Sequence, residues 1–216
     1  MNQWFNIDRG DLGENAVRLY EAAHEHCHPN FPCVDVGVRH GVSSRIFLMA
    51  THGKVLGIDT DAGAVSPDLL AHPRYEFSHS DSVTALFRMT RTISAAMVDT
   101  LHIKEQVMAE TYYLWPLLRV GGFIAYHDTA WPEGRKDHYL GQDWDRPEDG
   151  IKEMFGDLPG CVVNHFPESW GMSFVYKPSD CKLPSSIDWP QVFNCRNRLL
   201  ATLPDQIRNQ AIEITL

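Results

Sequence analysis

Short apolar segments that end at a glycine or an acid recur along this chain and alternate with segments of helical periodicity. They are CVDVG, VLGID, YEFSHSD, ISAAMVD and FIAYHD. Such alternation favours a mostly parallel sheet with right-handed helical crossovers. Two later apolar segments, GCVVNHF and GMSFVYK, are separated only by PESW, which predicts an antiparallel hairpin. We therefore predict an α/β fold with a seven-stranded, mostly parallel sheet, a C-terminal antiparallel hairpin and helices on both faces.

The composition fits one compact domain, since 44% of the 216 residues are hydrophobic and 22% are charged. We divide it into an N-terminal helical extension (1–31), a core (32–177) and a C-terminal helical tail (178–216). Helical spacing predicts an amphipathic helix over residues 13–27. The segment HIKEQVMAETYYLWPLL predicts a long helix, and the following RVGG predicts a glycine cap at its C-terminal end.

Charge and cysteine content restrict the class of protein. A formal net charge of -9 disfavours a nucleic-acid partner, because such proteins concentrate Lys and Arg on one face. Five cysteines without a C-x-x-C pair are typical of a reducing compartment. No apolar run reaches the roughly twenty residues of a membrane helix. We expect a cytoplasmic protein with no membrane partner, and the helices at both termini could support a homo-oligomer.

The ends of the predicted strands indicate where a ligand binds. In an open sheet of this kind ligands lie beyond the carboxyl ends of the strands. That rule selects five places, which are Gly37, Asp59, Asp81, Asp99 and the pair His127–Asp128. The loop from Trp131 to Trp144 holds three aromatic residues among mixed charges and could cover these ends as a lid, or form a subunit contact or a surface loop. Trp170 is expected near the same face, in the pocket or the core.

Three of these strand ends have the residue types of a nucleotide site. VDVGVRHGVSS lacks the G-x-G-x-x-G spacing of dinucleotide-binding folds, so a tight turn that merely needs glycine is the alternative to a ligand-binding role. Asp59 follows a strand at the place where an acid binds ribose hydroxyls, and helix capping is its alternative. Ser80, Asp81 and Ser82 suit the exocyclic amine of adenine but also form an ordinary helix N-cap sequence.

A second group of polar residues follows the fourth and fifth predicted strands. Asp99, His127 and Asp128 are the predicted ligands of Mg²⁺ or another divalent cation, because carboxylates suit Mg²⁺ and imidazole suits the softer divalent ions. Asp99, His102 and His127 are the predicted catalytic residues, with the two imidazoles as candidate bases. A histidine at a strand end that only caps or hydrogen-bonds is the alternative.

The order VDVGVRHGVSS, VLGID, SHSDS, MVDTLH and WPLLRVGGFIAYHDT resembles class I S-adenosylmethionine-dependent methyltransferases. It is most similar to the group with macrocin-type and rhamnosyl O-methyltransferases and cephalosporin-hydroxylase-like proteins, over roughly residues 32–177. The resemblance implies a Rossmann-like methyltransferase fold. It also implies cofactor contacts, with the methionine end at Asp35, Gly37, Gly41 and Ser43, the ribose at Asp59, the adenine at Asp81 with Ser80 and Ser82, and a further contact at Asp99.

The sequence departs from this group at the metal site. His127 stands where the group has an acid, and Thr100-Leu101 replaces the Gly-Asp of an Asp-Gly-Asp-His pattern. We expect O-methylation of a small hydroxylated molecule with S-adenosylmethionine as cofactor, assisted by a divalent metal. The alternatives are a non-catalytic S-adenosylmethionine-binding protein in regulation or assembly, and a dehydrogenase, which the missing G-x-G-x-x-G disfavours.

Overall fold

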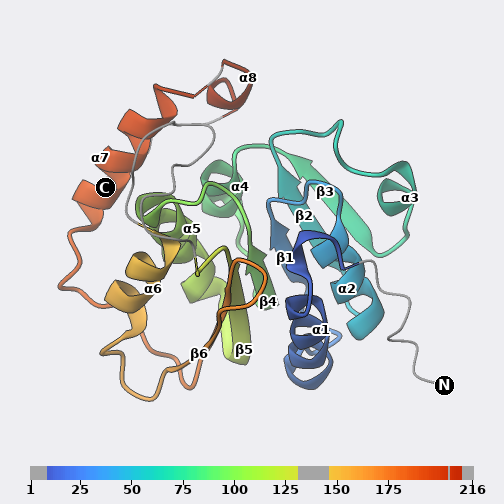
Figure 1. Cartoon of the computed structure of the whole chain (residues 1–216), viewed down its shortest axis with the longest axis horizontal. Helices are drawn as coiled ribbons and strands as arrows, with labels where there is room; N and C mark the ends of the chain where they lie inside the picture. The colour runs from blue at the N-terminus through green and yellow to red at the C-terminus, as the bar shows by residue number, and fades with distance from the viewer. Residues whose placement is uncertain (1–8, 131–145, 204, 211–216) are drawn as a thin grey trace.

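The computed structural model describes residues 9–130, 146–203 and 205–210, and strands alternate with helices along them as predicted (Figure 1). Seven strands form one sheet in the order β3-β2-β1-β4-β5-β7-β6. Strands β1 to β5 run parallel, whereas β7 is antiparallel to both β5 and β6. The predicted fold and its C-terminal hairpin are confirmed. The strands are β1 (Cys33–Val36), β2 (Val55–Asp59), β3 (Tyr75–His79), β4 (Ile93–Val98), β5 (Leu118–His127), β6 (Val162–Phe166) and β7 (Met172–Tyr176).

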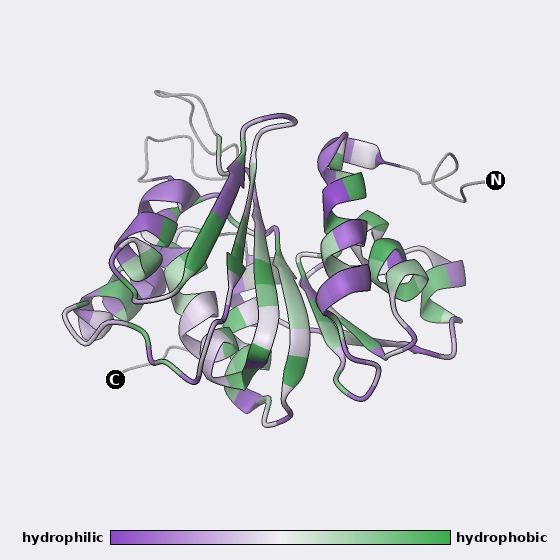
Figure 2. Ribbon diagram, turned by 90° about the horizontal axis from the view of Figure 1, so that it is seen from below, coloured by the Kyte–Doolittle hydropathy of each residue, from purple (hydrophilic) through white to green (hydrophobic). Residues whose placement is uncertain are grey.

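Helices cover both faces of the sheet (Figures 1 and 2). On one face lie the 3-10 turn η2 (Gly10–Leu12) and the helices α1 (Asn15–His26), α2 (Val42–Ala50) and α3 (Pro67–Leu70). On the other lie α4 (Ser82–Arg88), α5 (Lys104–Leu117), α6 (Pro147–Phe155) and α7 (Trp189–Leu200), and the short α8 (Asp205–Arg208) follows α7. No helix in these described ranges has the length and apolar character needed to cross a membrane.

Strand β4 shows why the central strands are continuous apolar segments in the sequence. Ala96 and Val98 pack into the core beneath α4 to α7, whereas Ala95 and Met97 pack into the core beneath α1 to α3. All six residues of this strand are buried. A strand between two helical layers needs an apolar side chain on each face, so a strict alternation of apolar and polar residues is not expected.

The junction between α5 and β5 corrects one prediction. No glycine caps α5, because β5 begins at Leu118, directly after the last helical residue. The predicted cap residues Gly121 and Gly122 lie inside β5, where a Cβ on Gly122 would stand 2.4 Å from the carbonyl oxygen of Ser94. The Nζ of Lys177 donates to two carbonyl oxygens at this junction, that of Trp115 at 2.9 Å and that of Leu118 at 2.8 Å. A buried lysine from the end of the hairpin therefore supplies the cap.

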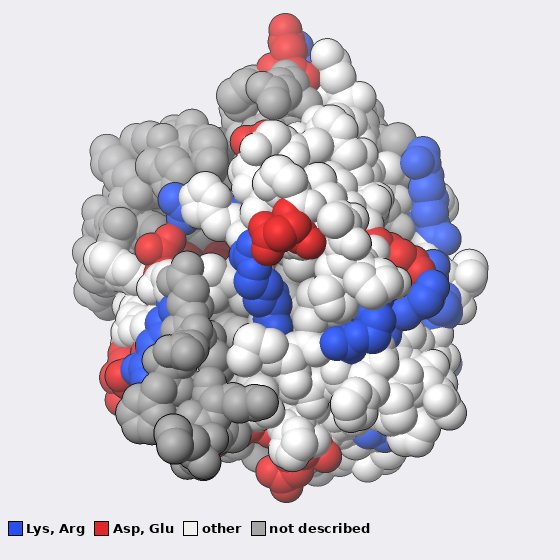
Figure 3. All heavy atoms as spheres, turned by 90° about the vertical axis from the view of Figure 1, so that its right-hand side faces the viewer, with Lys and Arg blue, Asp and Glu red and all other residues white. Residues whose placement is uncertain are grey.

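The face that carries α3 mixes charges of both signs. Figure 3 shows lysine, arginine and acidic side chains next to one another on this face. Arg45 pairs with Asp68, and Glu76 contacts both Lys54 and Arg91. Neighbouring charges of opposite sign weaken the attraction for a polyanion. The predicted lid, Trp131 to Trp144, lies outside the described residues.

Candidate active site

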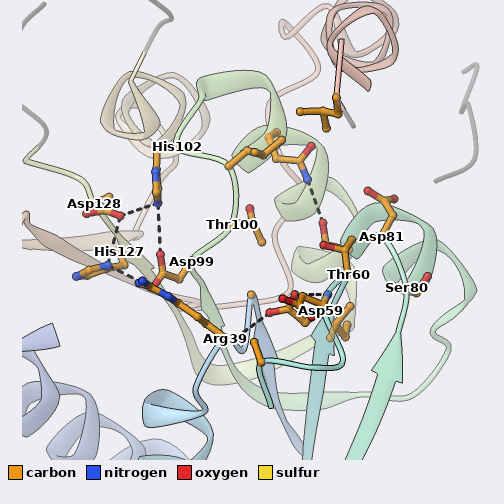
Figure 4. A pocket seen from close by; sticks show the side chains of 18 of the residues that line it. Arg39, Asp59, Thr60, Ser80, Asp81, Asp99, Thr100, His102, His127 and Asp128 are labelled. Atoms are coloured by element: carbon orange, nitrogen blue, oxygen red, sulfur yellow. Dashed lines mark hydrogen bonds and ion pairs between the residues drawn. The ribbon is translucent and has the colours of Figure 1, made fainter. Parts of the chain in front are cut away.

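The carboxyl ends of β1 to β5 open onto a cavity of about 780 Å³ (Figure 4). A volume of this size lies within the usual range of small-molecule sites. All the strand ends selected from the sequence reach it. The predicted site residues that line it are Gly37, Asp59, Ser80, Asp81, Ser82, Asp99, His102, His127 and Asp128, and Trp170 also lines it.

The first turn of the site requires glycine at its beginning. Gly37 has a φ of 86°, and a Cβ on it would stand 1.9 Å from the carbonyl oxygen of Asp99. Any side chain there would push apart the ends of β1 and β4. Gly41, with a φ of 78°, immediately precedes α2. The glycines of VDVGVRHGVSS thus serve a tight turn, and that turn also borders the cavity at Gly37.

Three residues that the resemblance places at the methionine end of the cofactor do not line the cavity. These are Asp35, Gly41 and Ser43. Asp35 is fully buried, and the hydroxyls of Ser43 and Ser44 donate to its carboxylate at 2.8 Å and 2.5 Å. Burial raises the pKa of Asp35 to about 7, against the opposing effect of these hydroxyl donors. The three residues support the turn from beneath, and their contact with a cofactor stays a prediction.

Asp59 holds the loops on both sides of the cavity floor. Its Oδ2 accepts a hydrogen bond from the backbone N–H of Arg39 at 2.8 Å, and its Oδ1 accepts one from that of Asp61 at 2.9 Å. Arg39 has a φ of 46°, so a left-handed residue presents its N–H to the acid. The carboxylate lines the cavity beside Thr60. Ribose binding by Asp59 stays a prediction that this position permits.

Asp81 accepts two hydrogen bonds that matter for its role. The sequence around Asp81 predicts the first of them but not the second. Its Oδ2 accepts from the backbone N–H of Thr84 at 2.9 Å, which is the N-cap bond considered as the alternative role. The same oxygen accepts from Nη2 of Arg196 at 2.6 Å, and the Arg196 side chain is fully buried. Arg196 belongs to α7, in the tail outside the resemblance. Nothing in the local pattern of α7 marks this arginine as a partner of Asp81.

Four ionisable residues converge on the other side of the cavity (Figure 4). The Nε2 of His102 lies 2.7 Å from Oδ2 of Asp128 and 3.6 Å from Oδ1 of Asp99. The Nδ1 of His127 lies 3.3 Å from Oδ2 of Asp99, and its Nε2 lies 3.1 Å from the carbonyl oxygen of Ser169. His102 therefore faces the cavity between two carboxylates, whereas both nitrogens of His127 face protein oxygens.

The set that can hold a cation differs from the predicted one. Within the described residues, Asp99, His102 and Asp128 offer ligand atoms that all lie within 4.8 Å of one another. The sequence predicted His127 in place of His102. The two histidines could not be told apart in the sequence, because the difference arises from the direction of each ring.

The charges in this cluster stabilise one another. Burial alone would raise the pKa of Asp99, but hydrogen bonds from His102 and His127 hold it well below its usual range. The same two imidazoles outweigh burial at Asp128 and lower its pKa. Burial alone would lower the pKa of His127, but Asp128 and Asp99 raise it to about 10. The two carboxylates therefore favour the protonated form of His127.

Strained backbone surrounds the cluster. Asp128 has a φ of 56°, and the facing turn places Ser169 at 51° and Trp170 at 68°. Residues with side chains seldom adopt such angles, and they persist where surrounding contacts impose them. Here the backbone N–H of Ala130 donates to the carbonyl oxygen of Trp170 at 2.7 Å. This contact holds the segment after Asp128 against the β6–β7 turn beside the cavity.

A buried carboxylate beside the cavity was not predicted. Glu110 on α5 is fully buried and accepts hydrogen bonds from Ser82 at 2.5 Å, from Thr100 at 2.8 Å and from Gln106 at 2.7 Å. Burial raises the pKa of Glu110 to about 7, with these donors opposing the rise. Its three partners all line the cavity. In the sequence Glu110 is one polar residue of a helix, and only the packing of α5 shows its role.

Comparison with known proteins agrees with this architecture. Residues 34–129, which run from the second residue of β1 to just beyond β5, match a family model described as a methyltransferase domain. No curated protein matches the chain.

Solved structures share the fold. A protein from Corynebacterium glutamicum aligns with a TM-score of 0.62 and 17% identity, over 81% of this chain and 88% of that one. The Podospora anserina methyltransferase PaMTH1, solved with S-adenosylhomocysteine, gives 0.55 and 12%, over 76% and 78%. A candidate caffeoyl-CoA O-methyltransferase from Staphylococcus aureus gives 0.56 and 14%, over 77% and 81%. Structures described as rRNA methylases also align. The fold is thus the Rossmann-like methyltransferase fold.

Proposed function

We propose that this chain, in which residues 34–129 match the model of a methyltransferase domain, is an S-adenosylmethionine-dependent methyltransferase that transfers the methyl group to a hydroxyl oxygen of a small molecule. One observation carries the proposal. The cluster of Asp99, His102 and Asp128 stands at the ends of β4 and β5, across the cavity from Asp59. A cofactor whose ribose lies at Asp59 can direct its sulfonium methyl toward this cluster, where a hydroxyl would be held and activated.

The cluster fits a divalent cation. Two ligands at right angles on an ion with bonds of about 2.1 Å are about 3 Å apart. The distances of 2.7 Å and 3.6 Å from Nε2 of His102 to Asp128 and Asp99 lie on either side of that value. We assign Asp99, His102 and Asp128 as the ligands. One nitrogen and two carboxylates suit Mn²⁺, Fe²⁺ or Zn²⁺ at least as well as Mg²⁺. A bound cation would lower the pKa of the acceptor hydroxyl.

The chain's own residues have separate tasks in this scheme. His127, fixed between the two carboxylates and Ser169, orients the ligands and holds no free nitrogen toward the acceptor. Methyl transfer from a sulfonium is a displacement with a good leaving group, so alignment of donor and acceptor is the main requirement. The ends of β4 and β5 hold the acceptor side of that alignment, and the close contact between Gly37 and Asp99 fixes the end of β1 against the end of β4.

The acceptor site favours a small molecule over RNA. Leu101 and Trp170 border the cavity beside the cluster and offer apolar contacts to an acceptor. The net charge of -9 and the mixed charges on the face that carries α3 disfavour the binding of a phosphate backbone. The rRNA methylases among the similar structures share the fold, and fold alone does not assign an acceptor.

Transfer of a tritiated methyl group tests the proposal directly. Labelled S-adenosylmethionine is incubated with the full chain and a panel of phenols, sugars and hydroxy acids, with Mn²⁺ or with EDTA, and total rRNA serves as a separate acceptor. We expect labelling of a small hydroxylated acceptor that EDTA reduces at least tenfold and that Asp99→Asn abolishes. Labelling only of rRNA would contradict the acceptor class. Labelling that resists EDTA but is lost on substitution of His102 would contradict the role of a cation and indicate that His102 acts as the base. Cofactor binding without any transfer would support the non-catalytic alternative.

A further inference from the structure

Two cysteines at the beginning of β1 lie in direct contact. The Sγ of Cys33 donates a hydrogen bond to the Sγ of Cys27, and the two sulfurs are 3.5 Å apart. Cys27 follows the last residue of α1, and Cys33 is the first residue of β1. All five cysteines of the chain lie in the described ranges as free thiols. Because the cavity lies at the carboxyl ends of the strands, this pair stands at the opposite end of the sheet.

The fold holds these two cysteines together. The loop between them, HPNFP, is fixed at both of its ends by Ser94 of β4. The Ser94 hydroxyl accepts a hydrogen bond from the backbone N–H of His28 at 2.7 Å, and the Ser94 N–H donates to the carbonyl oxygen of Pro32 at 2.8 Å. Cys33 itself is paired with both β2 and β4. The contact between the sulfurs is therefore set by the sheet.

The two thiols differ in exposure and in acidity. Cys33 is 1% exposed, whereas Cys27 is half-buried. The hydrogen bond to Cys27 and burial raise the pKa of Cys33 well above its usual value. A reagent from solution therefore meets Cys27 first, while Cys33 keeps its proton. The sulfurs of a disulfide are about 2.05 Å apart, so this pair must approach by about 1.5 Å, which rotation of the two side chains can supply.

We propose that Cys27 and Cys33 are a redox modification site, in which they form a reversible disulfide by exchange with a small-molecule disulfide such as oxidised glutathione. The Cys27 thiolate attacks one sulfur of oxidised glutathione, forms a mixed disulfide and releases one glutathione thiolate. Cys33 then loses its proton to water, because Cys27 no longer accepts its hydrogen bond as a thiol. The Cys33 thiolate attacks Sγ of Cys27 and releases the second glutathione thiolate.

Two protein thiols are thus oxidised while one oxidised glutathione is reduced to two molecules of glutathione. The new bond ties the end of α1 to the beginning of β1, and excess glutathione reverses it. A disulfide that forms and breaks in this way is typical of redox sensing in a reducing compartment. The inference does not depend on the proposed function, since it involves neither the cavity nor a cofactor.

Peptide mapping detects the bond directly, because trypsin releases both cysteines in one peptide, residues 19–39, that holds no other cysteine. The reduced full chain is equilibrated with mixtures of reduced and oxidised glutathione, quenched in acid and treated with N-ethylmaleimide. We expect the oxidised peptide to carry no maleimide and to weigh two hydrogens less than the dithiol. The equilibrium constant should be at least about tenfold larger for the native chain than for the chain in urea, because the fold holds the sulfurs together. The oxidised chain should melt about 5 °C higher than the reduced chain.

Serine variants test the order of the two steps. In Cys33→Ser, Cys27 should keep one glutathione as a mixed disulfide, whereas in Cys27→Ser the buried Cys33 should stay a free thiol. Cys195→Ser, at a half-buried cysteine of α7, is the matched control and should leave oxidation of the 19–39 peptide unchanged. Thermal melting verifies that each variant is folded, and the mapping of the wild-type chain needs no variant. A wild-type peptide that keeps both maleimides in excess oxidised glutathione, or equal equilibrium constants with and without urea, would overturn the inference.

Discussion

At the scale of single residues, Asp59 and Asp61 offer a matched test of the ribose assignment. Each aspartate accepts a hydrogen bond from the backbone N–H of the residue two positions later in the chain. Only Asp59 also accepts one from the backbone N–H of Arg39, in the turn after β1. We expect Asp59→Ala to weaken binding of S-adenosylhomocysteine about tenfold to hundredfold, as for loss of hydrogen bonds to a charged group. Asp61→Ala should stay within about threefold. Equal affinities for the two variants in calorimetry would remove the assignment of Asp59.

The buried carboxyl of Glu110 should make stability depend on pH. Burial raises its pKa from 4.5 to about 7 in the folded chain, so the native state holds the proton more tightly than the unfolded state. Stability from this group is therefore greatest below about pH 4.5, falls as the pH rises toward 7 and is constant above it. The full effect is on the order of 3 kcal/mol.

Urea unfolding of Glu110→Gln measures that contribution. The difference in unfolding free energy between this variant and the wild-type chain should grow in favour of the variant from about pH 4.5 to pH 7. Asp35, whose pKa is also raised to about 7, changes stability in the same direction but is common to both proteins. The exposed Glu21→Gln should produce no such trend. A constant difference between Glu110→Gln and wild type over this range would show that folding does not raise the pKa of Glu110.

At the scale of secondary-structure elements, Lys177 decides how α5 passes into β5. Its ammonium group is buried and donates to the carbonyl oxygens of Trp115 and Leu118. Lys177→Met keeps the side-chain length but leaves both oxygens without this donor, so we expect a loss of about 2–4 kcal/mol in the free energy of unfolding. The exposed Lys182→Met should change it by less than about 0.5 kcal/mol. If chemical denaturation gives the two variants the same free energy of unfolding, Lys177 does not cap α5.

Features that depend on the local sequence pattern were predictable, whereas features that depend on contacts between residues far apart in the chain were not. The strand ends at Gly37, Asp59 and Asp99 were predictable, because a parallel sheet brings the carboxyl ends of its strands to one edge. The cap of α5 was not, since its donor lies 62 residues from Trp115 in the sequence. A glycine pair that resembles a helix cap instead serves the strand, where close approach of Ser94 excludes a side chain at Gly122.

At the scale of the whole molecule, one buried ion pair joins the tail to the edge of the sheet. Asp81 and Arg196 are 115 residues apart, and neither is exposed. Loss of one partner leaves a buried charge unpaired, so Arg196→Met and Asp81→Asn should each destabilise the chain by about 3–5 kcal/mol. The double variant should lose less than the sum of the two. The same cycle at the exposed pair Lys54 and Glu76 should show much weaker coupling, and strict additivity at Asp81 and Arg196 would contradict the role of the pair.

This long-range pair also explains why part of the site escaped prediction. A tail without site motifs gave no sign that Leu200 and Leu203 border the cavity, because their place depends on Arg196 reaching Asp81. The histidines show the same limit on a smaller scale. Their positions at the ends of β4 and β5 were predictable, but their ring directions were not. The ring of His102 is directed by its contact with Asp128, and that of His127 by Ser169 in the turn after β6.

The central claim is that the cavity at the strand ends binds S-adenosylmethionine. Calorimetric titration of the full chain with S-adenosylhomocysteine tests it most directly, with NAD as the competing nucleotide and no need to know the acceptor. The account predicts one site with a dissociation constant of about 1 μM, on the order of −8 kcal/mol, and no binding of NAD. Absence of any heat with S-adenosylhomocysteine at millimolar concentration, with or without Mn²⁺, would contradict the account.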